Sequence, residues 1–157
     1  AAPGESADGW RPIGDPTEVA LLTLAIKGGV VPAELHTRAP RRAEIPFDSG
    51  QQMMATQHGD GGDSRVVLKG APERVLALCG CARRDGRDAP LDPAEELALR
   101  GLAEGMARRA LRVLAVAVVE RAEIDGREGF AGFRGRATLL GDACHAMLPM
   151  MAAFPRS

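Results

Sequence analysis

The distribution of apolar and polar positions predicts that the ordered part of the chain begins with a helix. Asp15 is suited to cap it, Pro16 to occupy its first position, and Glu18 to reach back toward the cap. Most positions from Val19 to Ile26 are apolar, and Gly28-Gly29 then predicts the end of the helix.

Short helical and extended segments follow. Residues 32–37 predict a brief second helix, and residues 43–49 predict a strand at a sheet edge, because a proline interrupts this run. Residues 53–58 and 65–69 predict a pair of strands, joined by the glycine-rich loop 59–63. This hairpin ends at Lys69, and its geometry predicts that Phe47 and Lys69 lie near one margin of the sheet.

The second half of the chain predicts further helices and strands. Residues 72–79 predict a helix and residues 80–90 a polar surface loop. Asp92 then predicts a capped amphipathic helix to about Ala110. The nearly continuous apolar run 111–119 predicts a central, doubly covered strand, and residues 136–140 a last short strand.

Three charged residues stand at the ends of predicted elements, and each allows two interpretations. Lys69 ends a strand and precedes Gly70, which lets a ligand approach closely, but a solvated lysine at a strand-turn-helix corner fits equally well. Arg112 lies at the mouth of the central strand, where it either ends in solvent or an ion pair, or meets an anion. Glu18 either caps its helix or contacts a ligand.

Composition limits the possible functions. The 157 residues suit one domain, and 20 basic against 21 acidic residues argue against nucleic acid or an anionic membrane as the main partner. Only four phenylalanines and one tryptophan are present, which argues against a surface of many stacked bases. The three cysteines suggest neither disulfides nor a zinc site. Without a run of roughly 18 apolar residues, we expect a soluble chain, and its start at Ala1 suggests a piece excised from a longer protein.

Four motifs occur in an order that resembles a known family. They are Gly14-Asp15-Pro16-Thr17-Glu18, Pro46-Phe47-Asp48-Ser49 with Met54, Lys69-Gly70-Ala71-Pro72-Glu73, and Leu111-Arg112-Val113-Leu114-Ala115. Together they resemble the nucleotide-binding (N) domain of P-type cation-transporting ATPases, and most of all the bacterial relatives of the calcium pump. The resemblance extends from Gly14 to about Leu140.

The resemblance implies an α+β fold, an antiparallel sheet flanked by helices, inserted into the cytoplasmic, HAD-like phosphorylation domain of a membrane pump. It implies that Phe47 stacks on adenine, Glu18 lies near the adenine edge, and Arg112 reaches the phosphates. Lys69 would line the pocket beside Gly70 and Ala71. The ligand would be ATP, with Mg²⁺ accompanying it in the parent pump. The implied partners are the phosphorylation and transmembrane domains, and no catalytic or metal-binding residue is implied in this segment.

The sequence departs from the family in two places. Gln52 stands where the family usually has a lysine, which predicts weaker contact with the triphosphate. The phosphorylated aspartate of the DKTGT motif is absent from these residues, so this piece is not expected to turn over ATP alone.

The tail 141–157 does not resemble the family. It begins Gly141-Asp142-Ala143-Cys144-His145 and resembles a segment of flavin-dependent monooxygenases, although no G-x-G-x-x-G motif accompanies it. We therefore expect a lead-in over residues 1–12, a nucleotide-binding domain over 13–140, and an atypical tail. A degenerate domain that no longer binds nucleotide and a flavoprotein fragment remain as alternatives.

Overall fold

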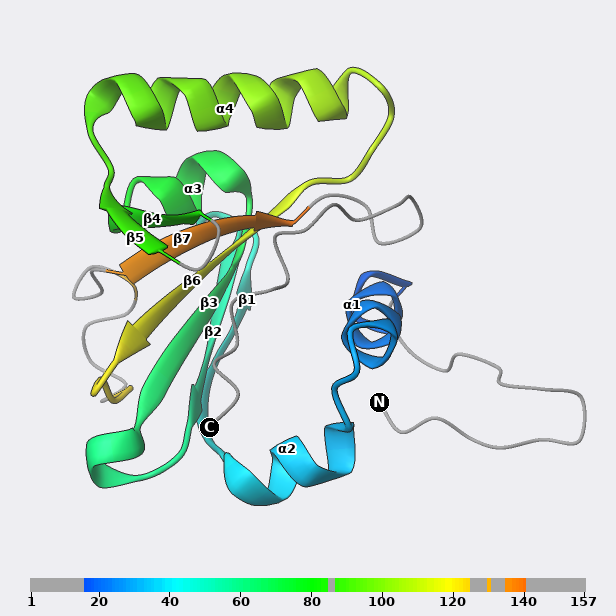
Figure 1. The fold of residues 1–157 in the computed structure, drawn as a ribbon, viewed down its shortest axis with the longest axis vertical. Helices are drawn as coiled ribbons and strands as arrows, with labels where there is room; N and C mark the ends of the chain where they lie inside the picture. The colour runs from blue at the N-terminus through cyan, green and yellow to red at the C-terminus, as the bar shows by residue number, and fades with distance from the viewer. Residues whose placement is uncertain (1–15, 85–86, 125–129, 131–134, 141–157) are drawn as a thin grey trace, which may run out of the picture.

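The computed structural model describes residues 16–84, 87–124, 130 and 135–140, which fold into a sheet with helices around it (Figure 1). The α-helices in these ranges are α1 (Pro16–Lys27), α2 (Pro32–Arg38), α3 (Pro72–Leu76) and α4 (Pro93–Ala107). The strands are β1 (Arg41–Asp48), β2 (Met53–His58), β3 (Arg65–Gly70), β4 (Cys79–Arg84), β5 (Arg87–Pro90), β6 (Leu114–Glu120) and β7 (Gly135–Leu140).

The strands form one sheet in the order β1-β2-β3-β6-β7-β4-β5. Neighbouring strands are antiparallel except β4 and β7, which are parallel. As predicted, β1 lies at an edge and β6 in the centre. The antiparallel sheet flanked by helices that the resemblance implies is confirmed, with one additional parallel pair.

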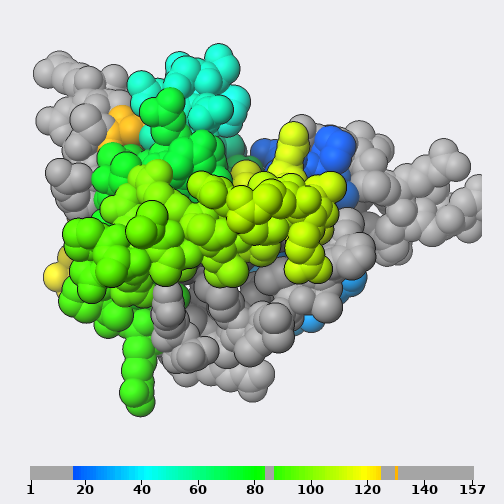
Figure 2. Space-filling view, turned by 90° about the horizontal axis from the view of Figure 1, so that it is seen from above, coloured from blue at the N-terminus to red at the C-terminus, as the bar shows by residue number. Residues whose placement is uncertain are grey.

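One face of the sheet carries the core, and α3 and α4 cover it (Figure 1). Figure 2 looks down onto this side and shows α4 running across it. The buried members of this core come from β2, β3, β4, β6 and the two helices: Met53, Ala55, Val66, Leu68, Ala82, Ala115, Ala117, Val75, Leu76, Leu99 and Ala103. Because side chains alternate along a strand, Lys69 and Val116 belong to the opposite face.

The first two helices lie beside this opposite face, near the β1 edge (Figure 1). Glycine ends α1 as predicted: Gly29 has φ +84°, and the Val30 amide donates to the Ala25 carbonyl at 3.0 Å, which is the pattern of a Schellman motif. In α1 only Leu24 is buried. Asp15, the predicted cap, lies outside the described residues.

The β2–β3 hairpin and the long helix α4 agree with the predictions made from the sequence. Strands β2 and β3 pair from Met53 opposite Gly70 to His58 opposite Arg65, and the loop between them contains a short 3₁₀ turn. The Asp92 carboxylate accepts a hydrogen bond from the Glu95 amide at 2.8 Å, which confirms the predicted cap of α4.

The prediction of a surface loop over residues 80–90 is wrong, because residues 80–84 and 87–90 belong to the antiparallel strands β4 and β5. Their sequence lacks regular apolar alternation, which is why it did not predict strands. In addition, the pairing of β4 with β7 shifts register at Gly80, between Cys79 and Cys81. A cross-strand ion pair between Arg83 and Asp88, at 2.7 Å, supplies polar pairing at this sheet edge instead.

Two other predicted boundaries move. Helix α3 ends at Leu76 rather than near Cys79, which already belongs to β4. Strand β6 begins at Leu114, so Arg112 lies just before it. The prediction that this strand is covered on both faces is wrong, because its face opposite the core is only partly buried.

The predicted limits of the domain, at residues 1–12 and 141–157, lie outside the described residues. Within the described part, no single helix is long and apolar enough to cross a membrane, and α1 and α2 meet the length and composition only as a pair bent by 95°.

Candidate nucleotide-binding site

The ends of four strands meet at one margin of the sheet. Asp48 at the end of β1 pairs with Met53 at the start of β2, Met53 pairs with Gly70 at the end of β3, and Gly70 pairs with Ala115 in β6. This row follows from the antiparallel order, in which the end of one strand lies beside the start of the next. The margin therefore collects residues from segments that are far apart in the sequence.

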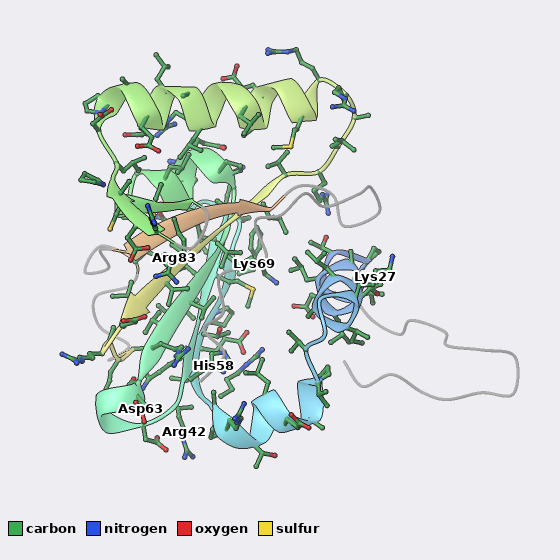
Figure 3. All side chains as sticks on the ribbon, in the orientation of Figure 1. Lys27, Arg42, His58, Asp63, Lys69 and Arg83 are labelled. Atoms are coloured by element: carbon green, nitrogen blue, oxygen red, sulfur yellow. The ribbon has the colours of Figure 1, made fainter. Side chains whose placement is uncertain are left out.

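Lys69 lies at this margin on the face of the sheet opposite the core (Figure 3). Its cross-strand neighbours are Met54 on β2 and Val116 on β6, so Met54 flanks it directly. Its side chain is 23% exposed, and its ammonium nitrogen lies 3.6 Å from a carboxylate oxygen of Glu18 on α1. The cation is partly sheltered but still accessible from solvent, where it can attract an anion.

Arg112 approaches the same end of α1. Its guanidinium donates a hydrogen bond to the hydroxyl oxygen of Thr17 at 2.9 Å. Thr17 and Glu18 are adjacent in the first turn of α1, so one helical turn contacts both candidate cations. The sequence did not single out Thr17, although it stands within the same motif as Glu18.

Phe47 precedes Asp48 at the end of edge strand β1. Phe47 is 62% exposed, so its ring is accessible from solvent. The pairing of β1 with β2 is irregular between Ile45 and Asp48, as at a bulge, and Pro46 stands in this interval. The irregular edge leaves an aromatic face open to solvent at the margin that also carries Lys69.

Gly70 lies in contact with the turn between β1 and β2. A Cβ built on Gly70 would lie 2.4 Å from the Gln52 carbonyl oxygen and 2.8 Å from the Met53 Cγ. The same Gln52 oxygen accepts a hydrogen bond from the Ala71 amide at 3.0 Å. Glycine at position 70 is thus required by protein packing, whereas the sequence suggested it would admit a ligand.

Gln52 stands beside this contact and is exposed. Its φ of 56° places it in the left-handed region, at the end of a turn in which the Asp48 carbonyl accepts from the Gln52 amide. The Asp48 carboxylate also accepts from the Gln51 amide at 2.7 Å. The turn holds residue 52 next to Ala71, close to the strand end that carries Lys69.

These positions combine an open aromatic face with a lysine and an arginine at one sheet margin. The aromatic ring can stack on a planar base, and the two cations can bind an anionic group. Each cation is held by α1 through one carboxylate or hydroxyl oxygen. Of the residues that the sequence predicted, the structure brings Lys69, Met54, Glu18 and Arg112 together and places Phe47 at the same margin.

Comparison with known proteins identifies the class to which this fold belongs. The family described as "P-type ATPase, cytoplasmic domain N" matches residues 1–131. The chain therefore belongs to the cytoplasmic N domains of P-type ATPases, and the resemblance in the four motifs is confirmed.

Individual relatives are cation-transporting ATPases. The chain is 46% identical over 106 residues to a probable cation-transporting ATPase F of Mycobacterium tuberculosis (strain ATCC 25618 / H37Rv), covering 68% of this chain and 12% of that protein. It is 41% identical over 111 residues to cation-transporting ATPase pma1 of Synechocystis, a match that covers 70% of this chain and 12% of that protein. It is 35% identical over 105 residues to calcium-transporting ATPase 1 of Lactococcus lactis, a match that covers 67% of this chain and 12% of that protein. The chain thus corresponds to about an eighth of the length of these relatives.

Proposed function

We propose that this domain binds ATP and holds it for transfer of its terminal phosphoryl group to an aspartate in the phosphorylation domain of a P-type cation pump. The observation that carries the proposal is the grouping of Lys69, Arg112 and the exposed Phe47 at one margin of the sheet. Membership in the N-domain family supports the same function.

The residues of the proposed site form two groups, one that contacts the base and one that contacts the phosphates. Phe47 offers the stacking face for adenine, and Met54 adds an apolar neighbour beside Lys69. Glu18 accepts from the adenine amine while it keeps Lys69 in place. Lys69 and Arg112 attract the phosphates, whereas Gln52 and the Gly70-Ala71 segment form the wall at the strand end.

The residues present fit the nucleotide better than they fit a metal ion. The described residues contain no group of three His, Cys, Asp or Glu side chains that could hold a metal. We propose that Mg²⁺ arrives with the nucleotide, whose phosphates it neutralises in part. This chain's own residues contribute binding and orientation, which is how an enzyme positions a phosphoryl donor.

The parent protein is proposed from the relatives. Because the calcium-transporting ATPase of Lactococcus lactis is among them, we propose calcium as the transported ion. The proposed partners of this domain are the phosphorylation and transmembrane domains of that pump, on the cytoplasmic side of the membrane.

Fluorescence titration with an ATP analogue labelled on the ribose tests nucleotide binding. The wild-type chain should bind saturably, and unlabelled ATP should displace the analogue. Phe47→Ala should weaken binding by about tenfold, because stacking on a base contributes about 1–3 kcal/mol. Leu35→Ala provides the matched control, since it removes another exposed apolar side chain, on α2, which contributes no residue to the proposed site.

Three results would contradict the proposal. Absence of saturable binding by the wild-type chain would favour a degenerate domain. Equal effects of Phe47→Ala and Leu35→Ala would show that Phe47 does not contact the base. A yellow preparation with flavin absorbance would favour the flavoprotein alternative instead.

A further inference from the structure

Three residues other than glycine have a left-handed backbone within the described part of the chain. They are Gln52, Ala110 and Arg121, with φ of 56°, 58° and 55°. This conformation brings the Cβ too close to the backbone, so it persists only where the surroundings demand it, and such residues cluster at functional sites. Gln52 borders the proposed nucleotide site through its bond to Ala71. Ala110 also borders it, because it precedes Arg112 by two positions.

Ala110 closes the C-terminal end of α4. Its amide donates to the Ala107 carbonyl at 2.9 Å, and the Leu111 amide donates to the Met106 carbonyl at 3.3 Å. These two bonds are the pattern of a Schellman motif, in which the left-handed position is usually glycine. Ala110 is exposed, so a larger side chain has room to extend into solvent. Substitutions at this position therefore act on the backbone conformation rather than on core packing.

The turn at Ala110 sets the direction in which the chain enters β6. Val113 packs against the core, on the side of the sheet that α3 and α4 cover. Arg112 reaches the other side, because its guanidinium donates to the hydroxyl oxygen of Thr17 at 2.9 Å. Thr17 belongs to α1, which lies beside the opposite face of the sheet (Figure 1). The chain thus passes from a helix on the core side to a contact on the opposite face within two residues of Ala110.

The position of the Arg112 side chain depends on this backbone. Arg112 is exposed, so close packing does not hold its long side chain in one conformation. Its guanidinium can meet Thr17 only if the backbone at Arg112 faces α1. A change of backbone conformation two residues earlier would turn the side chain away from the first turn of α1.

We propose that Ala110 is a positioning residue for Arg112, whose left-handed conformation directs the guanidinium to the first turn of α1 and to the phosphates of a bound nucleotide. The contact with phosphates rests on the proposed function, whereas the contact with Thr17 exists without a nucleotide. Ala110 itself touches no ligand and acts only through Arg112.

NMR spectra of the full 157-residue chain with labelled threonine methyl groups test the positioning without any ligand. Valine disfavours a left-handed backbone because it is branched at Cβ. Ala110→Val should therefore move the Thr17 methyl signal to the position it takes in Arg112→Ala. Arg121→Val is the matched control, since Arg121 is also exposed and left-handed but follows the other end of β6. It should leave the Thr17 signal in place.

Calorimetric titration with ATP and with adenosine tests the consequence for binding. Ala110→Val should weaken ATP binding by about threefold, as expected for loss of one exposed charge contact, and should leave adenosine binding unchanged. In the Arg112→Ala background, Ala110→Val should cause no further loss, because Ala110 acts through Arg112. Arg121→Val should bind ATP like the wild type.

The two measurements distinguish this proposal from the proposed nucleotide site. If the wild-type chain does not bind ATP while the Thr17 signal responds as predicted, the nucleotide site is wrong and the positioning of Arg112 is confirmed. The positioning is overturned if Ala110→Val leaves the Thr17 signal in place. It is also overturned if Ala110→Val and Arg112→Ala weaken ATP binding additively.

Ala110→Gly keeps the proposal testable if the valine variant does not fold. Glycine adopts the left-handed conformation without a Cβ contact, so the Thr17 signal should keep its wild-type position and the midpoint of urea unfolding should rise. An unchanged or lower midpoint, or a Thr17 signal at the position found in Arg112→Ala, would overturn the role of the left-handed backbone.

Discussion

The carbonyl oxygen of Gln52 accepts a hydrogen bond from the amide of Ala71 at 3.0 Å. This bond joins the turn between β1 and β2 to the corner between β3 and α3. It holds residue 52, where the family usually has a lysine, next to the strand end that carries Lys69. The side chain at position 52 is therefore well placed to affect the anion-binding end of the proposed pocket.

Replacing Gln52 by lysine should strengthen ATP binding by about threefold, since an exposed cation near an anion contributes about 0.2–1 kcal/mol. The left-handed backbone at this position accommodates lysine no worse than glutamine, because both side chains have the same branching. Calorimetric titration with ATP and with adenosine separates the phosphate contribution. An equal gain for adenosine would show that position 52 does not face the phosphates.

Gly70→Ala should destabilise the fold by about 1–3 kcal/mol, because the new methyl group would overlap the Gln52 carbonyl and the Met53 backbone. Urea denaturation measures this loss as a lower unfolding midpoint.

Gly101→Ala is the matched control for this substitution. Gly101 lies within α4 with nothing near its missing Cβ, so alanine there should stabilise the chain by about 0.5–1 kcal/mol. Similar changes in midpoint for both variants would contradict the close packing at Gly70.

Asp92→Ala should destabilise the chain by about 1 kcal/mol, because the Glu95 amide at the start of α4 loses its acceptor. Asp92→Asn keeps a side-chain oxygen at the same position and should retain most of the stability. The difference between the two unfolding midpoints measures the cap, and equal midpoints would show that the hydrogen bond contributes nothing.

Burial raises the pKa of the Cys79 thiol from 9.0 to about 11, with smaller contributions from Cys81 and Glu96. The thiol therefore stays protonated at pH 8, where alkylation of native Cys79 by iodoacetamide should be about a hundredfold slower than in the urea-unfolded chain, as expected for a two-unit difference. Replacing Cys81 and Cys144 by serine makes the reaction specific to Cys79.

The same shift gives a pH dependence of stability. Between pH 9 and about 11 the native chain keeps the Cys79 proton that the unfolded chain has lost, so the free energy of unfolding should fall as the pH rises through this window. The Cys79→Ser variant should lack this component. Equal alkylation rates in the native and unfolded chains at pH 8 would contradict the burial of Cys79.

The sequence predicted those elements whose signals are local. The proline and glycines around α1, the Asp92 cap and the glycine-rich hairpin loop each act within a few residues, and the structure confirms the elements they predict. The β4–β5 hairpin could not be predicted in this way. Its strands are polar, and they depend on a parallel partner, β7, more than 50 residues further along the chain.

The candidate site was predictable in part for a similar reason. The motifs identified Glu18, Phe47, Lys69 and Arg112, and the antiparallel order explains why the strand ends at or near Phe47, Lys69 and Arg112 meet. Glu18 comes from α1 instead. The role of Thr17 as the partner of Arg112 depends on where α1 lies in three dimensions. The requirement for glycine at position 70 likewise arises from the nearby backbone of Gln52, and no local sequence pattern reveals this contact.

Calorimetric titration of Lys69→Ala with ATP tests the central claim most directly, with Lys27→Ala as the control. Lys27 also ends a regular element near the protein surface, but it lies at the far end of α1 from Glu18 (Figure 3). Loss of the Lys69 ammonium should weaken ATP binding by about tenfold, because a hydrogen bond to a charged group contributes about 1.5–3 kcal/mol. Lys27→Ala should bind like the wild type. If Lys69→Ala binds ATP with unchanged affinity while remaining folded, this margin of the sheet is not the nucleotide site.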